Sequence, residues 1–351
     1  ISGRRFAYLA TVTDSSSTSY TFGKNMDQNY GTTAIDEYAV DVTWEVADKT
    51  DIGVDMRLLN NKLNLQFDYF KESREGIYLR RSSIPSYVGM INNPYGNIGK
   101  VENKGFELSV NYANSWGGDW SLSLMGNYSF NRNKVLEDDS TVVYPWQNTI
   151  GNKVGQRFGL VALGLFESYG EIAASPVQTG DTRPGDIKYK DINGDGKIDE
   201  YDKVPIGWGS VPEIMYGFGF SLGWKNLSLT AMFQGAAHVD AMLSGEGVLP
   251  FSQGSSRGNL LSNITDRWTE ENPRQNAFYP RLSIGNINMN YEESTWWLKD
   301  TDYLRLKNIE LSYRLPDHWM KRIHLDNARI FIQGVNLLTF SSFKIWDVEL
   351  G

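Results

Sequence analysis

Hydrophobic and polar residues alternate with a period of two along much of the chain. In KGFELSVNY, Phe106, Leu108 and Val110 alternate with Glu107 and Ser109. The same alternation recurs in residues 50–59, 63–69, 120–130, 215–224, 227–233 and 309–315. Successive side chains of a strand point to opposite faces, so this pattern predicts an all-β, antiparallel protein whose strands have one polar and one apolar face.

Strand length and loop length favour a membrane protein. Many predicted strands run about 9 to 12 residues, the length that crosses a bilayer at a tilt, rather than the usual five or six. Tight turns at LLNNKL, NSWGGDW and GWKNL alternate with long, structureless connections at residues 74–100, 132–156, 168–212 and 238–299. The pattern favours a transmembrane β-barrel with short periplasmic turns and long extracellular loops. A soluble β-sandwich, with its apolar face packed inside, stays open as the alternative.

Two short segments interrupt the strand pattern. Asp14 to Tyr20 (DSSSTSY) is predicted to be a loop, and Leu315 to Ile323 (LPDHWMKRI) is predicted to contain a short helical turn. The sequence shows no convincing domain boundary.

The composition excludes several classes of protein. Lys and Arg number 34 against 42 Asp and Glu, a formal net charge of −8, whereas nucleic-acid binding needs a basic face. The chain has no cysteine, so it forms neither disulfides nor thiolate metal sites. No apolar run approaches the roughly 20 residues of a transmembrane helix. The mean hydropathy of −0.41 is compatible with a barrel, because lipid-facing and lumen-facing residues alternate along its strands.

Several stretches carry the motifs of a known family, in the family's order. They are TWEVADKTDIGVDMRLLNNKLNLQFDYF, IGKVENKGFELSVNY, GDIKYKDINGDGKIDEYDKVPIG, PEIMYGFGFSLGWKNLSLTAMFQG, DTDYLRLKNIELSYRLP and ARIFIQGVNLLTFSSFKIWDVEL. These stretches, which cover nearly the whole chain, resemble the SusC-type TonB-dependent transporters of Bacteroidota.

The resemblance implies both a fold and a task. The family's complete barrel has 22 strands, and residues 1–351 are similar to a C-terminal portion of it with about ten strands. The plug domain, the TonB box and the last strands are not expected in this chain, which does not begin with Met. The implied function is TonB-dependent import of an oligosaccharide or peptide across the cell outer membrane, without catalysis. The implied partners are a SusD-like surface lipoprotein, the TonB–ExbB–ExbD complex and outer-membrane lipid, in an assembly that includes a dimer of transporter–lipoprotein pairs.

The stretch DINGDGKIDEYD has the spacing of a calcium-binding loop, with Gly196 at the sharp turn. The oxygen donors expected for Ca²⁺ are Asp191, Asn193, Asp195, the carbonyl of Lys197, Asp199 and Asp202. The last position carries Asp instead of a bidentate Glu, which predicts a weaker site. No amphipathic helices flank the loop, so a calcium sensor is not expected. A structural Ca²⁺ in an extracellular loop and a metal-free turn held by Asx hydrogen bonds both stay open.

Two groups of aromatic and amide residues are candidates for binding a glycan or peptide. The first group, in a loop with two prolines, consists of Tyr87, Asn92, Asn93 and Tyr95; a solvated loop is its alternative role. The second group is Trp296 and Trp297, just before a predicted strand. Their expected place is the aromatic belt at the membrane interface, with a sugar-stacking platform as the alternative.

Lumen-facing polar residues are candidates for lining a path through the barrel, although most of them are expected simply to be solvated. They are Asn64, Gln66, Asn111, Asn127 and Gln234.

The remaining chemistry points away from an enzyme. His238, His318 and His324 show no metal-ligand spacing and no adjacent nucleophile, so a hydrolytic triad is not expected. A glycan-cleaving enzyme would need a carboxylate pair at a fixed separation, and the sequence marks no such pair. The main alternative to an importer is a soluble, secreted, calcium-stabilised β-sandwich that binds carbohydrate.

Overall fold

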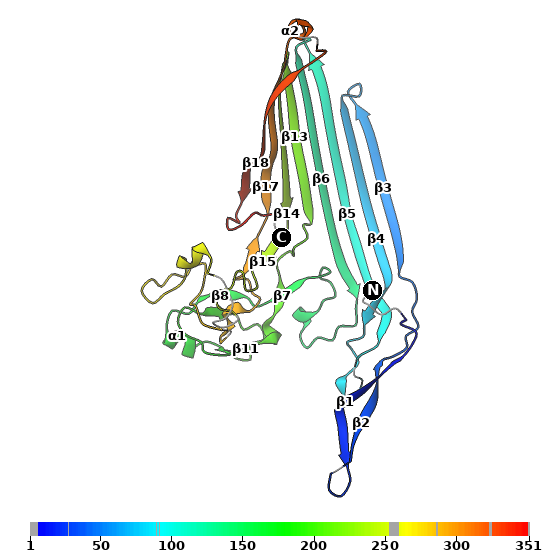
Figure 1. Ribbon diagram of the computed structural model, residues 1–351, viewed down its shortest axis with the longest axis vertical. Coiled ribbons are helices and arrows are strands. Elements are labelled where there is room, and N and C mark those ends of the chain that lie inside the picture. The colour runs from blue at the N-terminus through cyan, green and yellow to red at the C-terminus, as the bar shows by residue number, and fades with distance from the viewer. Residues whose placement is uncertain are drawn as a thin grey trace. The chain divides into compact units, whose positions relative to one another are not determined.

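The computed structural model describes residues 6–26, 28–88, 90, 92–252, 260–285, 287–322 and 325–349, and it confirms an all-β chain (Figure 1). Contacts group the chain into two compact units. One comprises Ile1–Asp51, Phe70–Lys104 and Arg132–Val154, and the other Ile52–Tyr69, Gly105–Asn131 and Gly155–Gly351. The sequence gives no sign of this division, because segments of the two units alternate along the chain.

The longest strands form one eight-stranded sheet in the order β18-β17-β14-β13-β6-β5-β4-β3. They are β3 (Val46–Leu58), β4 (Leu63–Arg80), β5 (Tyr95–Trp116), β6 (Trp120–Glu137), β13 (Ile214–Trp224), β14 (Leu227–Ala237), β17 (Tyr303–Arg314) and β18 (Arg329–Ser341). Long strands that follow one another along the chain are neighbours in the sheet. The pairs from β6 to β18 are antiparallel, as the alternating pattern predicts.

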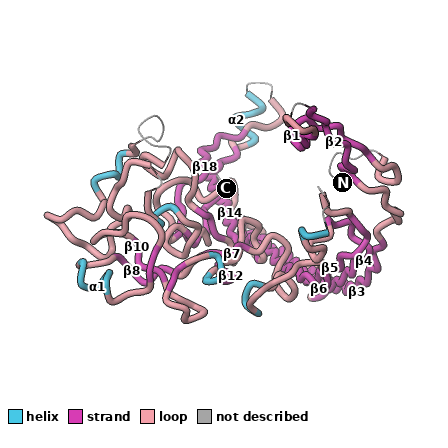
Figure 2. The backbone as a smooth tube through the Cα atoms, turned by 90° about the horizontal axis from the view of Figure 1, so that it is seen from below, coloured by secondary structure: helices cyan, strands magenta, loops and turns pink. Residues whose placement is uncertain are grey.

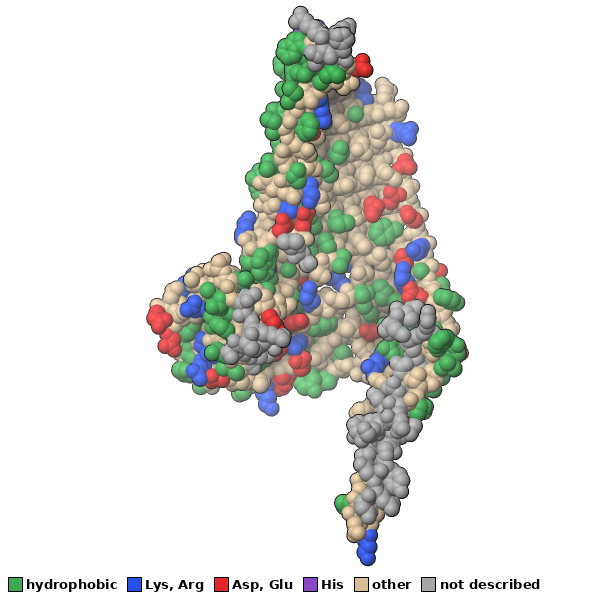
Figure 3. All heavy atoms as spheres, viewed as in Figure 1, with side chains coloured by type: hydrophobic (Ala, Val, Ile, Leu, Met, Phe, Trp, Pro, Cys, Tyr) green, Lys and Arg blue, Asp and Glu red, His purple; other side chains and the backbone are tan. Residues whose placement is uncertain are grey.

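The register places the apolar residues of neighbouring strands on one face. In the pairing of β6 with β13, Leu124 lies opposite Phe220 and Leu122 opposite Leu222. The intervening residues, such as Ser123 opposite Ser221, form the polar face. Figure 3 shows hydrophobic side chains exposed along β17 and β18, where Ile332 is 77% and Phe340 57% exposed.

Aromatic pairs mark two levels of the apolar face. Trp120 lies opposite Trp224, with ring centroids 6.0 Å apart, and Tyr128 lies opposite Tyr216 eight residues further along. Eight residues span about 26 Å along a strand, and a typical barrel tilt of about 40° reduces this to about 20 Å. This height is close to the ~25 Å apolar band, flanked by aromatic girdles, of outer-membrane barrels.

The tight turns lie where the sequence predicts them. Leu59, Asn60 and Asn61 all have positive φ between β3 and β4, and Lys225 has φ 53° between β13 and β14. Positive φ at successive residues matches the twist of short hairpin turns, so these turns hold the register of the strands that they join.

The loops predicted at residues 74–100 and 132–156 are shorter than expected. β4 continues to Arg80, β5 begins at Tyr95 and β6 continues to Glu137, so residues 74–80, 95–100 and 132–137 are strand. Ion pairs replace hydrophobic contacts in this part of the β4–β5 hairpin, for example Lys71 with Glu102 at 2.8 Å and Lys100 with Glu75. Charged residues among the apolar ones interrupt the period-2 pattern from which the sequence predicts a strand.

The prediction of a loop at Asp14 to Tyr20 is wrong. β1 (Thr11–Phe22) and β2 (Gln28–Glu37) form a separate two-stranded sheet. Their register shifts between Ser15 and Tyr20. Backbone pairing with β2 overrides the weak local signal of a Ser-rich segment, and the shift breaks the alternation that would have predicted a strand.

The long connections at 168–212 and 238–299 are not structureless. Together with adjacent residues they form what we call the loop layer, which comprises residues 155–212 and 238–302. Figure 2 shows several short strands within it. Its strands are β7 (Arg157–Gly159), β8 (Ala162–Leu165), β9 (Val177–Gln178), β10 (Ile187–Tyr189), β11 (Lys197–Ile198), β12 (Val204–Ile206), β15 (Asp240–Met242) and β16 (Leu298–Asp300). They pair as β8–β10, β9–β11, β7–β12 and β15–β16.

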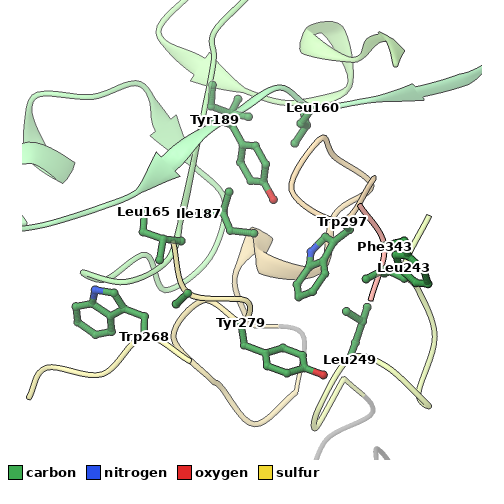
Figure 4. Packing of buried hydrophobic residues seen from close by; sticks show 12 residues of the cluster. Leu160, Leu165, Ile187, Tyr189, Leu243, Leu249, Trp268, Tyr279, Trp297 and Phe343 are labelled. Atoms are coloured by element: carbon green, nitrogen blue, oxygen red, sulfur yellow. The ribbon is translucent and has the colours of Figure 1, made fainter. Parts of the chain in front are cut away.

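The buried hydrophobic core lies in the loop layer. Leu160, Ile187, Tyr189, Tyr279 and Trp297 are all at most 1% exposed, and they come from two segments at least 90 residues apart. Figure 4 shows these side chains converging from the separate segments. The core therefore makes one packed body from two connections that are distant in sequence.

The described helices are short. They are α1 (Tyr169–Ala173), α2 (Asp317–Arg322) and the 3₁₀ turns Ser86–Val88, Pro145–Gln147, Glu200–Asp202, Ser262–Thr265 and Met289–Tyr291. α2 confirms the helical turn predicted for residues 315–323. None of the helices among the described residues is long and apolar enough to cross a membrane.

The β-sandwich alternative is wrong. A sandwich buries its apolar face against a second sheet, whereas Phe218, Leu311, Ile332 and Leu338 are each at least 45% exposed on the eight-stranded sheet. Every other sheet among the described residues has two strands. The apolar face is left open.

Candidate functional site

A cavity of about 880 Å³ lies against the polar face of the sheet. Residues of β5, β6, β13, β14 and β17 line it together with residues 239–244 of the loop layer and 346–349 beyond β18. Its polar lining includes Glu107, Ser109, Asn127, Ser129, Arg157, Gln234, Asp240, Asp347 and Glu349. Its apolar lining includes Met215, Met232, Met242, Leu243, Phe343 and Trp346. Apolar surface with a few polar groups is typical of a ligand-binding site.

Two carboxylates that line the cavity, Asp347 and Glu349, form ion pairs with cations of β17 that lie behind the lining. Arg305, with only 3% of its side chain exposed, pairs with Asp347 at 2.5 Å and with Glu349 at 2.7 Å. Lys307 Nζ lies 3.0 Å from Glu349, and the hydroxyl of Tyr303 donates to Glu349 at 3.1 Å. The hydrogen bond from Arg305 lowers the pKa of the Asp347 carboxyl. The cluster thus balances two cations on a strand with two carboxylates from a segment outside the sheet.

Asp240 joins the segment of the loop layer that precedes β13 to the segment that follows β14. Its carboxylate is 4% exposed and accepts from the backbone N–H groups of Trp208 and Gly209. The Trp208 ring stacks on His238 with centroids 4.0 Å apart, and His238 Nδ1 lies 3.1 Å from a Glu213 carboxylate oxygen. These contacts hold the loop layer beside the cavity.

A second buried cluster joins the two halves of the loop layer. Arg281 forms two hydrogen bonds of 2.9 Å with Asp186, which is 2% exposed. Asn288 and Asn290 donate to the same carboxylate at 3.2 and 2.8 Å. Gly185, beside Asp186, has φ +87° and lies so close to the Trp268 ring that a side chain there would collide with it. We call this set the Asp186 clasp.

The ionisable side chains in the core of the loop layer are buried and have a structural role. Burial raises the pKa of Tyr189, and raises that of Tyr291 to about 12. Burial lowers the pKa of Lys299, whose ammonium donates to the carbonyl of Trp296 at 2.7 Å. The phenols of Tyr189 and Tyr291 donate to backbone carbonyls of Met289 and Pro250, so each buried polar tip has a partner.

In the predicted calcium loop, backbone N–H groups occupy the carboxylates. Asp191 accepts from Gly194 and Gly196. Asp202 is fully buried and accepts from Ile192 at 2.7 Å and from Asp199 at 2.9 Å. The remaining predicted donors Asn193, Asp195 and Asp199 accept from Asp195, Lys197 and Tyr201. Among the described residues, no three Asp, Glu or His side chains gather as a metal centre would require. These contacts favour the Asx-turn interpretation.

The glycan-binding candidates of the first group do not form one site. Tyr87 is 88% exposed, whereas Tyr95 stacks on Tyr78 at 5.0 Å. Asn92 accepts from Arg80, and Asn93 donates to the carbonyl of Ile84. Most of these side chains therefore hold their own loop, and their role in binding stays a prediction.

The prediction for the two tryptophans is wrong for Trp297. Its ring is 1% exposed and its indole N–H donates to Asn290 at 2.7 Å, so it can neither lie in a lipid interface nor stack on a sugar. Trp296 packs against the same core and donates to Phe278 at 3.2 Å. Both tryptophans belong to the packing of the loop layer, which the local sequence does not reveal.

The polar strand residues predicted to line a path do line cavities. Asn127 and Gln234 line the large cavity. Asn64, Gln66 and Asn111 line a second cavity of about 520 Å³. The sequence analysis missed Arg305, Tyr303 and the two carboxylates beyond β18, although charged residues at polar-face positions of a strand are a usable signal.

Comparison with known proteins gives concordant matches. A profile of the family "TonB dependent receptor-like, beta-barrel" matches residues 10–337. TonB-dependent receptor P3 of Formosa agariphila is 28% identical over 92% of this chain and 32% of its own length. TonB-dependent receptor SusC of Bacteroides thetaiotaomicron is 24% identical over 99% of this chain and 34% of its own length. The structure of the RagAB peptide importer in the "open-open" state matches with a TM-score of 0.65 at 20% identity, over 99% of this chain and 36% of that one. The chain thus spans about a third of the relatives that it matches.

Proposed function

Because the chain belongs to the TonB-dependent receptor-like β-barrel family, we propose that it forms part of the wall of an active importer in the outer membrane. Proteins of this family are outer-membrane β-barrels, and the chain lies in that membrane. One observation carries the transport role. The sheet has an exposed apolar face between two aromatic levels, and its opposite, polar face lines an 880 Å³ cavity.

The proposed cargo is an oligosaccharide or a peptide. The matched relatives include SusC and the RagAB peptide importer, and the cavity offers both polar groups and aromatic surface. A SusD-like surface lipoprotein is the proposed partner, and TonB–ExbB–ExbD the proposed source of energy. The complete protein, not this segment alone, would perform transport, in single or paired transporter–lipoprotein complexes.

The proposal includes no covalent chemistry. The matched relatives are receptors and transporters, and the cavity's charged groups form ion pairs with one another. The work of this chain is then to enclose a polar path and to present the loop layer at its mouth.

We expect the full-length protein to be recovered from the outer-membrane fraction and to migrate faster on gels before boiling than after, because closed barrels resist detergent until heated. Native mass spectrometry in mild detergent should show a co-purifying lipoprotein. Recovery from the soluble fraction, with the same migration before and after heating, would contradict the proposed function.

Calcium stays a prediction for residues 191–202, and the backbone hydrogen bonds lead us to expect little dependence on it. Removing calcium with EDTA should leave the rate of proteolysis within this loop unchanged. The reason is that Asp191 and Asp202 already receive N–H donors. Protection by millimolar CaCl₂ that disappears in Asp191→Asn, but persists in the control Asp181→Asn, would establish a calcium site instead.

A further inference from the structure

The segment after β18 turns back over the polar face of the sheet. We call residues 343–349 the strap. At its start, Phe343 is 9% exposed and joins the core of the loop layer, with its ring 6.0 Å from that of Trp346. At its end, Asp347 and Glu349 line the cavity with 45% and 29% of their side chains exposed. Ile345 and Val348 also pack against that core, so the solvated part of the strap is the pair of carboxylates at its end.

The solvated end is held by side chains of β17. Arg305 bonds to Asp347 and Glu349, while Lys307 and Tyr303 bond to Glu349. Among the described residues, no backbone–backbone hydrogen bond joins the strap to the sheet, and the N–H of Phe343 donates to the Ser341 hydroxyl at the end of β18. Charged hydrogen bonds that are partly solvated are exchangeable, since a competing anion can replace each carboxylate.

Arg305 keeps an unused donor at this point. Its side chain is 3% exposed, and its Nε has no hydrogen-bond partner among the described residues. A guanidinium binds a carboxylate best through two parallel N–H groups, whereas Asp347 and Glu349 each take one terminal nitrogen. The strap therefore satisfies Arg305 incompletely, and a free carboxylate could use its donors more fully.

We propose that Arg305, Lys307 and Tyr303 form a binding site for a carboxylate group of the cargo, and that Asp347 and Glu349 occupy this site until cargo displaces the strap. This inference rests on the proposed function and names a chemical class of cargo for its cavity. The two cations and one hydroxyl donor all lie on β17 and all contact Glu349, and Arg305 contacts Asp347 as well. Acidic peptides and uronic-acid oligosaccharides share the required group.

The test uses the purified full-length transporter and four probes. C-terminally amidated tetraglutamate and trigalacturonate carry carboxylates, and C-terminally amidated tetraglutamine and maltotriose, which carry none, are their counterparts. A dye on Lys344→Cys, an exposed position of the strap, can report the strap's release once any cysteine elsewhere in the full-length protein has been replaced by serine. We expect a charged probe, but neither neutral one, to change the dye signal. Whichever charged probe acts identifies the cargo as peptide or glycan.

Variants distinguish competition between the strap and the probe from a simple attraction of the probe to positive charge. The double variant Asp347→Asn/Glu349→Gln should bind the effective charged probe about tenfold more tightly, since the internal competitor is gone. Arg305→Gln should weaken it at least tenfold. If Arg305→Gln loses heat-modifiable folding, Lys307→Gln carries the test with about a threefold loss. Glu310 lies on β17 like Arg305 and pairs with Arg329 of β18, so Glu310→Gln is the matched control and should change nothing.

Equal responses to charged and neutral probes, or no gain in the double variant, would overturn the inference. Energised uptake of cargo in cells is scored separately. If uptake persists while the carboxylate probes show no preference, the proposed function stands and only the carboxylate site is wrong. If uptake and outer-membrane localisation both fail, the proposed function fails first.

Discussion

Replacing Asp186 with alanine is expected to separate the two halves of the loop layer while the eight-stranded sheet stays folded. Asp186 is 2% exposed and binds Arg281, Asn288 and Asn290, which lie about a hundred residues further along the chain. Removing one member of a buried ion pair leaves the other charge unpaired, at a cost of about 3–5 kcal/mol. That is a large part of the roughly 5–15 kcal/mol that stabilises a domain.

Limited trypsin digestion measures this effect. In Asp186→Ala, cleavage at Lys188 and Arg281 should accelerate at least tenfold, and heat-modifiable migration should persist. Asp181→Ala is the matched control, because its ion pair with Arg183 is half exposed and such pairs contribute at most about 1 kcal/mol. Equal digestion of the two variants would show that the clasp does not hold the loop layer together.

The sequence is most informative where one face of a strand is apolar. Period-2 alternation identifies β13 and β14 well because each strand has one exposed apolar face and one polar face. The β4–β5 hairpin beyond Lys71 escapes the same analysis, since charged cross-strand pairs interrupt its apolar residues. Hydrophobic periodicity predicts a strand only where apolar and polar residues alternate without interruption.

The loop layer is hidden from local sequence for a different reason. Its core unites Ile187 with Trp297, and its clasp unites Asp186 with Arg281. Neither partner shows a helical or strand period, because each contributes only a few residues from an irregular segment. Tertiary contacts between residues about a hundred positions apart determine this structure. The local sequence therefore predicts that Trp297 is an exposed aromatic residue, and only its tertiary neighbours show that it is buried.

The candidate site is partly predictable from the sequence. Asn127 and Gln234 are predictable as polar-face residues, and both line the cavity. Arg305 alternates regularly in YLRLKNIELSYR, yet its importance depends on the carboxylates that fold back to meet it. The sequence therefore predicts the wall of the cavity, while the charge pairing across it requires the structure.

Replacing Leu124 with arginine is expected to destabilise the folded protein in lipid by about 2–4 kcal/mol, the cost of a cation on the lipid face near the bilayer midplane. Leu124 lies opposite Phe220 and midway between the levels of Trp120 and Tyr128. Its side chain is 41% exposed on the apolar face. The measurement is urea unfolding in lipid vesicles, followed by heat-modifiable migration.

The neighbouring Met125→Arg provides the control, since the strand period turns residue 125 to the polar face. Met125 is 50% exposed, so both substitutions place the same cation on an exposed, apolar position one residue apart. Only the medium that each face meets differs. If the apolar face contacts lipid, Leu124→Arg should unfold at clearly lower urea while Met125→Arg stays within about 0.5 kcal/mol of the unmodified protein. Equal effects would mean that both faces meet water, and the assignment of the apolar face to the membrane would be wrong.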